Sequence, residues 1–455
     1  MAATILTATI VGLDAHPIDV EADISPGLGA FLIVGLPDKA VQEARERVRS
    51  AMKYVELPFP RTKVTINLAP ADLPKTGTGF DLPIAIATLV AHGELQAKED
   101  KTRMVIGELS LDGKLRGIQG ALSVALLAAS LHVDELILPR CNADEAALVP
   151  DLAVFGADTL RAVIDHLSDR EKLSRTPPRA VETPDGVAGI PDMGAIRGQE
   201  QAKRALEIAA AGGHNILLQG PPGSGKTLLA RSFPGILPRM TIAEILETTR
   251  IHSVAGLLPS SGYVAERPCR SPHHSASGVA LVGGGSIPKP GEISLAHRGV
   301  LFLDEFPEFP RPVLESLRQP LEDGFVTVSR VHGTISFPAR FTLIAAMNPC
   351  PCGFATDPDR PCVCTAIQVQ RYKKRLSGPL LDRIDLSIEV PKVPTSQLTD
   401  LTAGEPTSRI RERVQRARDR QTVRYQGLRF VTNAELTSDC IRKLIVPADD
   451  AREFL

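Results

Sequence analysis

The order of apolar and polar positions predicts an α/β protein. In the first third of the chain, short runs with strand-like alternation are separated by stretches in which apolar residues recur with helical spacing. The predicted strands are 1–14, 63–68 and 135–139, and the predicted helices are 38–54, 82–92 and 121–131. We therefore expect these residues to form an α/β domain that ends near Leu167.

A linker and a second α/β segment follow. Residues 168–191 are rich in Pro, Arg, Asp and Glu and have no apolar period, which is typical of an extended connection. Helical periodicity at 199–211 then precedes three continuous apolar runs at 215–219, 299–303 and 341–346. Fully apolar strands separated by helices predict a parallel sheet that is covered on both faces.

The last part of the chain, from about residue 394, is predicted to be helical and is rich in arginine. It stops at Leu455 without an obvious helix ending, so we interpret it as the start of a truncated helical lid. The expected domains are a first domain at 1–167, a linker at 168–191, a second core at 192–393 with a Cys-rich insert at 350–364, and the lid at 394–455.

Composition adds little to this picture. The 455 residues carry 52 basic and 53 acidic side chains, so any nucleic-acid surface has to come from local clusters of Lys and Arg. The N-terminus lacks a basic secretory leader, and no uncharged apolar run approaches the roughly 20 residues of a membrane helix. We therefore expect a cytoplasmic protein with no membrane partner.

The second segment contains a complete phosphate-binding loop of the form G-x-x-x-x-G-K-[ST]. Its residues are Gly220, Pro221, Pro222, Gly223, Ser224, Gly225, Lys226 and Thr227. The glycines let backbone N–H groups approach phosphate oxygens, while Lys226 reaches the β- and γ-phosphates and Thr227 coordinates Mg²⁺. The loop lies between a predicted buried strand and a predicted helix, so ATP and Mg²⁺ are the expected cofactors.

Polar groups follow two later strands of the same predicted sheet. Asp304 is expected to hold Mg²⁺ and Glu305 to orient or deprotonate the attacking water, because ligands collect at the carboxyl ends of parallel strands. Asn348 is placed to contact the γ-phosphate or the water, and an Asn before Pro is also a common turn former. Arg383 is a candidate to neutralise the phosphates of a neighbouring subunit's nucleotide, with an Asp–Arg surface pair as the alternative.

These motifs resemble those of AAA+ ATPases of the magnesium-chelatase branch, and within it the YifB/ComM group. The resemblance spans essentially the whole chain and rests on residues 198–199, 220–227, 270–274, 281–285, 290–297, 303–306, 347–353 and 378–385.

The resemblance implies a ring, usually a homohexamer, with ATP at the subunit interfaces. It places Gly198 and Gln199 at the nucleotide, makes Asn348 the first sensor and makes Arg383 the arginine finger. The family also has a second sensor arginine in a further helical segment, which this chain does not contain. We therefore expect nucleotide binding more than vigorous hydrolysis.

The first domain resembles the Lon-protease fold, which is ribosomal S5 domain 2-like. By that resemblance Gly79 takes the place of the serine nucleophile and Leu122 that of the catalytic lysine. Neither residue can act as nucleophile or base, so we expect a non-catalytic scaffold for ring stacking or DNA entry.

Four of the seven cysteines form two C-x-C pairs around a loop with few apolar residues: Cys350, Cys352, Cys362 and Cys364. Four thiolates on two short arms suit a tetrahedral Zn²⁺, and free thiols are the alternative. Because four protein ligands leave no open position, such an ion would be structural and would brace the strand that ends at Asn348.

Two surfaces are candidates for DNA contact. One is a stripe of arginines with helical spacing, formed by Arg409, Arg413, Arg416, Arg420 and Arg424; a solvated face or subunit contact is the alternative. The other is a β-hairpin predicted at 324–337, with Arg330 and His332 near its tip. A hairpin with a purely structural role is the alternative. We interpret His273 and His274 as loop residues, because adjacent histidines rarely share one metal ion.

The leading hypothesis is a hexameric ATPase that translocates on branched or single-stranded DNA. It would drive branch migration during recombination of incoming DNA in natural transformation. The ATPase follows from the residues, whereas the DNA substrate follows mainly from the resemblance. A chelatase-type ATPase that assists metal insertion through partner subunits is the alternative, against which the Lon-like domain argues. An ATP-dependent protease is disfavoured by Gly79 and Leu122.

Overall fold

Two compact α/β units make up the chain. The computed structural model describes residues 3–96, 102–182, 189–285, 288–330, 333–394, 404–428, 430–444 and 448–454. The first unit contains Met1–Glu182 and Ile245–Val264, and the second contains Thr183–Glu244 and Ala265–Leu455. The predicted α/β class is confirmed in both units. Within the described ranges, no helix has the length and apolar character needed to cross a membrane.

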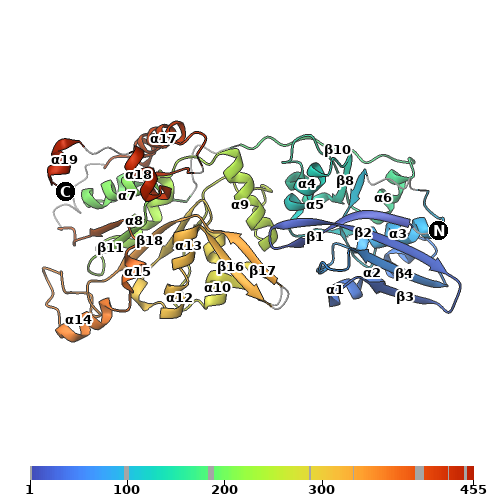
Figure 1. The fold of residues 1–455 in the computed structure, drawn as a ribbon, viewed down its shortest axis with the longest axis horizontal. Coiled ribbons are helices and arrows are strands. Elements are labelled where there is room, and N and C mark those ends of the chain that lie inside the picture. Colours follow the sequence, from blue (N-terminus) through green and yellow to red (C-terminus); the bar gives the residue numbers. More distant parts are fainter. Residues whose placement is uncertain are drawn as a thin grey trace. The chain divides into compact units, whose positions relative to one another are not determined.

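The first unit is built on a mixed eight-stranded sheet with the order β10-β9-β8-β5-β1-β2-β4-β3 (Figure 1). Its strands are β1 (Ala3–Val11), β2 (Asp14–Ser25), β3 (Ala30–Val34), β4 (Lys63–Ala69), β5 (Arg103–Val105), β8 (Glu135–Pro139), β9 (Ala153–Ala157) and β10 (Arg175–Thr176), with a separate pair β6 (Glu108–Leu109) and β7 (Leu115–Arg116). Its helices are α1 (Lys39–Gln42), α2 (Ala44–Tyr54), α3 (Asp81–His92), α4 (Ala121–Ser130), α5 (Arg140–Ala146) and α6 (Leu160–Leu167).

Alternation fixes which face of this sheet is buried. Along β4, Val64, Ile66 and Leu68 point into the core while the residues between them are more exposed. Helix α3 is buried along most of its length and packs on β1 and β2, as its continuous apolar sequence requires. The predicted strands at 63–68 and 135–139 correspond to β4 and β8.

A segment from the middle of the chain belongs to the first unit. Helix α9 (Ile242–Ala255) contributes its residues from Ile245 onward to this unit. There, Arg250 Nη2 donates to the carbonyl oxygen of Leu13 at 2.7 Å, and Ser253 Oγ accepts from the Gly120 N–H at 2.9 Å. The hydrophobic pattern did not predict this excursion, because its packing partners lie more than a hundred residues away.

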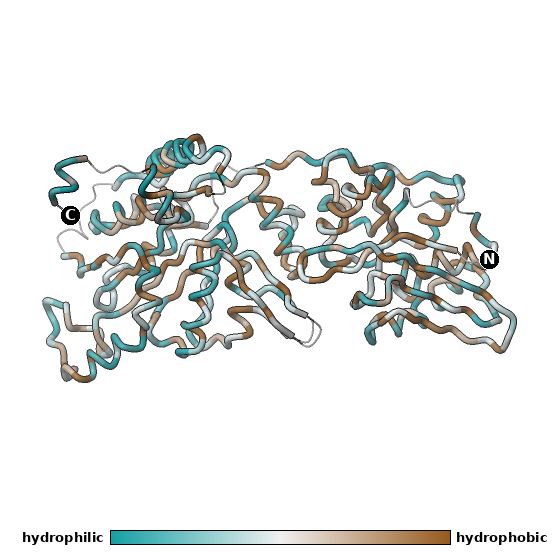
Figure 2. Tube along the Cα trace, in the orientation of Figure 1, coloured by the Kyte–Doolittle hydropathy of each residue, from teal (hydrophilic) through white to brown (hydrophobic). Residues whose placement is uncertain are grey.

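The second unit is built on a five-stranded sheet with the order β12-β15-β18-β11-β19, in which every neighbouring pair is parallel. The strands are β11 (Ile216–Gln219), β12 (Cys269–Arg270), β15 (Val300–Leu303), β18 (Thr342–Met347) and β19 (Leu386–Glu389). All residues of β15 and β18 are buried, so the predicted parallel sheet is confirmed. In Figure 2 the trace of α17 is largely in the hydrophilic colour.

Helices and short connections cover this sheet. They are α7 (Glu200–Gly212), α8 (Lys226–Ser232), α10 (Gly278–Val282), α11 (Glu292–Leu295), α12 (Arg311–Glu315), α13 (Arg318–Asp323), α14 (Ala366–Lys373), α15 (Gly378–Leu381), α17 (Thr407–Arg424), α18 (Ser438–Leu444) and α19 (Asp449–Phe454), with 3-10 turns η1 (Met193–Ala195), η2 (Phe233–Ile236), η3 (Phe306–Glu308) and η4 (Asn433–Glu435) and the small pair β13 (Gly283–Gly284) and β14 (Lys289–Pro290). Helix α17 packs Ile410 and Val414 into the core of this unit.

The predicted β-hairpin is also confirmed. Strand β16 (Phe325–Arg330) pairs antiparallel with β17 (Gly333–Pro338), and Arg330 lies opposite Gly333. The tip residue His332 and the side chain of Arg330, both named as candidates for DNA contact, lie outside the described residues.

Candidate nucleotide-binding site

The phosphate-binding loop connects β11 to α8, and its glycines are required by its geometry. Gly223 and Gly225 have φ values of 76° and 95°, in the left-handed region that glycine favours. A Cβ atom at Gly220 would lie 2.1 Å from the carbonyl oxygen of Val390. Larger residues at these positions would therefore reshape the loop.

Lys226 joins this loop to the end of a neighbouring strand. Its side chain is only 8% exposed, and Nζ donates to the carbonyl oxygens of Gly220 and Pro221 at 2.8 and 2.9 Å. Nζ also lies 3.3 Å from Oδ1 of Asn348, at the end of β18. Burial lowers the pKa of the Lys226 ammonium, and the nearby Asp304 opposes that shift. The structure thus brings the loop lysine and Asn348 together.

The two predicted magnesium ligands are also adjacent. Thr227 Oγ1 donates to Asp304 Oδ2 at 2.8 Å, and the second carboxylate oxygen accepts the Glu305 N–H at 2.9 Å. A hydroxyl beside a carboxylate suits Mg²⁺, which prefers oxygen ligands. Within the part of the chain that the structure describes, Ser224 Oγ is buried without a hydrogen-bond partner. A phosphate oxygen would satisfy that hydroxyl, so the residues fit a magnesium nucleotide.

Gly198 and Gln199 lie next to the same loop. Both have left-handed backbone conformations, with φ values of 60° and 61°, and they lead into α7. Gln199 Nε2 donates to the carbonyl oxygens of Ser224 and Pro391, at 3.1 and 2.5 Å. Gln199 therefore links the loop to the segment that follows β19.

Glu305 is held by a histidine that the sequence analysis did not assign to the site. Its Oε2 lies 3.0 Å from Nδ1 of His274, and its backbone has a φ of 51°. The His274 ring lies 4.1 Å from the ring of His273 and meets Phe309 edge-on. The contact arises because β12, which leads to His274, pairs directly with β15, which leads to Glu305. No local sequence signal reveals such a pairing.

Arg383 is the predicted site residue that the structure does not bring to the loop. Its Nη2 forms an ion pair with Glu322 Oε1 at 2.6 Å, the one ion pair found for it among the described residues. Its action on a neighbouring subunit therefore stays a prediction.

The four clustered cysteines converge on one point. Their sulfur atoms all lie within 4.8 Å of one another, and Cys350 Sγ lies 3.4 Å from Cys352 Sγ and 3.6 Å from Cys362 Sγ. Zn–S bonds of about 2.3 Å in a tetrahedron place sulfurs about 3.8 Å apart, so the cluster fits Zn²⁺. Backbone N–H groups of Phe354 and Val363 lower the pKa of the Cys352 thiol to about 6, whereas burial and the neighbouring sulfurs raise the pKa of the Cys362 thiol to about 12. One thiolate among the four sulfurs is therefore favoured before any metal binds.

The cysteine loop packs against the phosphate-binding loop. Gly353 has a φ of 89°, and a Cβ atom there would lie 2.7 Å from Cγ of Pro222. This contact links the predicted zinc site to the nucleotide site, and neither motif alone reveals it.

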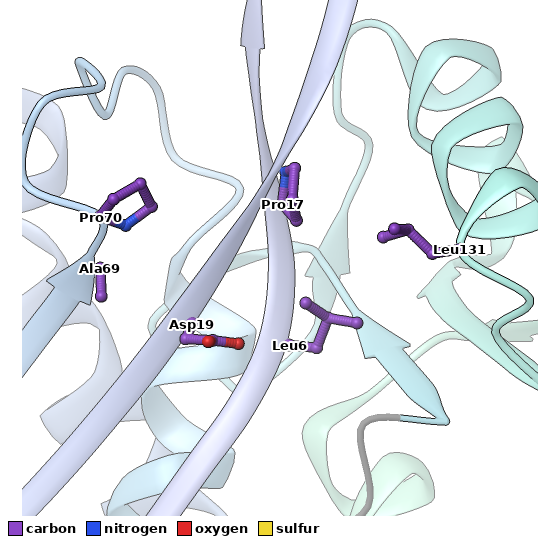
Figure 3. A pocket seen from close by; sticks show the side chains of 6 residues that line it. All are labelled: Leu6, Pro17, Asp19, Ala69, Pro70 and Leu131. Carbon is purple, nitrogen blue, oxygen red and sulfur yellow. The ribbon is translucent and has the colours of Figure 1, made fainter.

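The first unit brings no nucleophile and base together at the positions that resemble a protease site. Leu122 is fully buried, with its N–H bonded to Glu145 Oε1 at 2.7 Å, and a Cβ at Gly79 would lie 3.3 Å from the Ile106 side chain. A separate cleft has a volume of about 490 Å³. It is lined by Leu6, Pro17, Asp19, Ala69, Pro70 and Leu131, whose side chains are drawn in Figure 3. Among the described residues that line it, Asp19 is the charged one.

The predicted arginine stripe on α17 is partly used within its own unit. Arg413 Nε lies 2.7 Å from Glu207 Oε1, and its Nη2 lies 2.7 Å from Glu405 Oε2. Arg416 donates to the backbone of Glu412 at 3.4 Å. The stripe is thus less available to DNA than its spacing indicated.

Comparisons with known proteins agree with these motifs. The family described as "Magnesium chelatase, subunit ChlI" matches residues 192–398, and "Subunit ChlI of Mg-chelatase" matches residues 20–142. Competence protein ComM of Haemophilus influenzae is 46% identical over 442 residues, which cover 96% of this chain and 86% of that protein. The uncharacterized protein YifB of Escherichia coli is 47% identical over 441 residues, which cover 96% and 85% respectively. Magnesium-chelatase subunit ChlI-2 of Arabidopsis thaliana is 24% identical over 197 residues, covering 38% of this chain and 47% of that protein. The chain therefore belongs to the YifB/ComM family, within the magnesium-chelatase branch of the AAA+ proteins.

Proposed function

We propose that this protein is an ATP-driven ring motor that drives branch migration of DNA. The observation that carries the ATPase is the meeting of Lys226 with Asn348, and of Thr227 with Asp304, at one edge of the parallel sheet. The DNA substrate is supported by similarity to a relative named as a competence protein. We assign its activity to recombination of incoming DNA during natural transformation, on branched or single-stranded DNA.

In the proposed hydrolysis of ATP, each side chain of the site has a separate role. Bound ATP with Mg²⁺ supplies the phosphoryl group that is transferred to water. Lys226 would exchange its contacts with loop carbonyls for phosphate oxygens, and Thr227 and Asp304 would hold the metal ion. Glu305 leaves His274 to orient the attacking water, and Asn348 fixes the position of that water or of the γ-phosphate.

ATP turnover with and without branched DNA tests this proposal. We expect Lys226→Ala to lose nucleotide binding, and Glu305→Gln to bind nucleotide but to turn over at least about a hundredfold more slowly. The exposed Lys443→Ala, which removes the same charge on α18, is expected to match the wild type. If branched DNA neither binds to the wild-type protein nor stimulates its turnover, the DNA motor is excluded.

We also propose a homohexamer in which Arg383 completes the site of the next subunit. Rings made only of Arg383→Ala or only of Lys226→Ala subunits are expected to be inactive. Mixing the two variants creates interfaces with an intact loop on one side and an intact arginine on the other. Turnover should therefore recover in the mixture, and a mixture as inactive as its components would exclude the role in trans.

The cysteine cluster is proposed to hold one structural Zn²⁺. Metal analysis should find about one zinc per chain in the wild type and a large loss in Cys352→Ser. Cys440→Ser changes a cysteine outside the cluster and should retain the metal. Equal zinc content in both variants would exclude zinc binding by the cluster and would indicate that its thiols are free.

A chelatase-type ATPase is the second candidate, because both matching family descriptions name the chelatase subunit. Such a protein would turn over ATP without any response to DNA and would assist metal insertion only with partner subunits. Comparing ATP turnover with and without branched DNA distinguishes the chelatase-type ATPase from the DNA motor.

A further inference from the structure

A basic cleft in the second unit lies outside the nucleotide site. It has a volume of about 460 Å³ and is formed by η3, the start of α12 and the last turn of α14 with the residues after it. Among the described residues, four cations line it, Arg311, Arg371, Lys374 and Arg375, together with one carboxylate, that of Glu308. In Figure 1, α14 carries the orange colour of its place in the sequence, and α12 is yellow.

Most of this positive charge is uncompensated. Arg375 is paired, with Nη1 2.5 Å from Glu308 Oε2 and 3.1 Å from the carbonyl oxygen of Pro307. Across the described ranges, neither an ion pair nor a side-chain hydrogen bond is found for Arg311, Arg371 or Lys374, and all three are exposed. Like charges around one cleft repel one another, so an anion bound there would reduce the repulsion.

The fold also holds these cations in place. Helix α14 begins with a capping box between Thr365 and Gln368, directly after Cys364 of the cysteine cluster. Tyr372 is 6% exposed and anchors the end of the helix in the protein. Its neighbours Arg371 and Lys374 therefore project from an element fixed at both ends, which reduces the entropy lost on binding.

We propose that this basic cleft binds the phosphate backbone of a nucleic-acid strand, an inference that rests on the proposed action on DNA. Unpaired cations beside an open cleft match a strand that carries one charge per nucleotide. Backbone contacts carry no sequence information, which suits a motor that moves along DNA. The α17 stripe is the weaker candidate, because its Arg413 is already bound to two glutamates of the same unit.

The basic cleft is connected to the nucleotide site through the segment that follows Glu305. Its wall η3 starts at the residue after Glu305, and Phe309 lies in the cleft while it meets His274 edge-on. A phosphate that draws Arg375 away from Glu308 acts on this same short segment.

The test compares two variants that each lose two positive charges. Arg371→Ala/Lys374→Ala alters the cleft, and Arg416→Ala/Arg420→Ala alters exposed positions of α17. Binding of a fluorescent single-stranded oligonucleotide is measured at several salt concentrations with a non-hydrolysable ATP analogue. We expect the cleft variant to bind at least about tenfold more weakly, with a salt slope smaller by about 1.4, because each neutralised phosphate contributes about 0.7. The α17 variant should keep the affinity and slope of the wild type.

The outcomes separate this inference from the proposed function. If the wild type does not bind the oligonucleotide, the action on DNA fails; if it binds and the cleft variant binds equally, only the basic cleft is excluded. Loss of affinity in the α17 variant alone would place the DNA on α17. A cleft variant that sediments as a smaller assembly would instead make the cleft a subunit contact. Arg371→Lys/Lys374→Arg keeps both charges and should bind like the wild type, whereas a misfolded cleft would not be rescued this way.

Discussion

The contact between the cysteine loop and the phosphate-binding loop makes Gly353 a sensitive position. Gly353→Ala adds a Cβ atom 2.7 Å from Cγ and 2.8 Å from Cδ of Pro222. Carbon atoms prefer separations of about 3.5 Å or more, so one of the two loops has to move by about 0.8 Å. The proline ring cannot rotate out of the way, because it is fixed to the backbone.

Two costs have to be separated in this variant. The φ of 89° at Gly353 strains any L-residue by about 1–2 kcal/mol, whatever the surrounding space. Gly427 has a similar φ of 80° with nothing within 4 Å of its Cβ position, so Gly427→Ala carries the backbone cost alone. The additional displacement of Pro222 is specific to Gly353. A shift near 1 Å in groups that position a reactant lowers rates by up to about a hundredfold.

The assay is ATP turnover at saturating nucleotide, together with nucleotide affinity, melting temperature and zinc content. We expect both variants to fold, with the lower melting temperature in Gly353→Ala because of the added clash, and turnover to fall by roughly ten- to a hundredfold only in Gly353→Ala. Zinc content should stay at the wild-type level, which would show that the cysteine cluster is intact. If two folded variants turn over ATP within a factor of two of each other, the contact has no bearing on the nucleotide.

Two further predictions follow from side-chain contacts within the second unit. His274→Ala should raise ATP turnover without DNA several-fold, because Glu305 is no longer held at 3.0 Å, whereas His273→Ala should leave it near the wild-type rate; equal rates in both would refute a restraining role. Arg413 holds the pKa of Glu207 below its ordinary 4.5, so this pair stabilises the fold above pH 4.5 and the contribution is lost as pH falls through the lower folded pKa. Because Arg413 is partly exposed, the contribution is about 1 kcal/mol, and urea unfolding of Arg413→Ala should depend less on pH below 4.5 than that of the wild type; identical pH profiles would contradict it.

The local sequence was sufficient to predict the elements that carry the site. Strands β15 and β18 are buried along their whole length, so their apolar runs leave no alternative to a central position in the sheet. The loop glycines likewise reflect the local backbone, since Gly223 and Gly225 adopt left-handed conformations. The role of a residue can therefore be predicted from the sequence when it depends only on the strand or turn that contains the residue.

Contacts between loops that are distant in the sequence could not be predicted from local patterns. The excursion of 245–264 into the first unit depends on partners such as Leu13 and Gly120, and an amphipathic helix does not indicate which domain covers its apolar face. His274 gave no local sign of its role for a related reason. Two adjacent histidines in a loop are uninformative until the strand beside them is known.

The strand order explains both of the loop contacts that shape the nucleotide site. Because β12 neighbours β15, the loop after β12 reaches Glu305 through His274. Because β18 neighbours β11, the cysteine loop after β18 reaches Pro222 of the loop from Gly220 to Thr227. One loop thus acts on the carboxylate proposed to orient water, and the other on the groups proposed to hold nucleotide. Changes at His274 should accordingly alter turnover at constant nucleotide affinity, whereas changes at Gly353 should alter both.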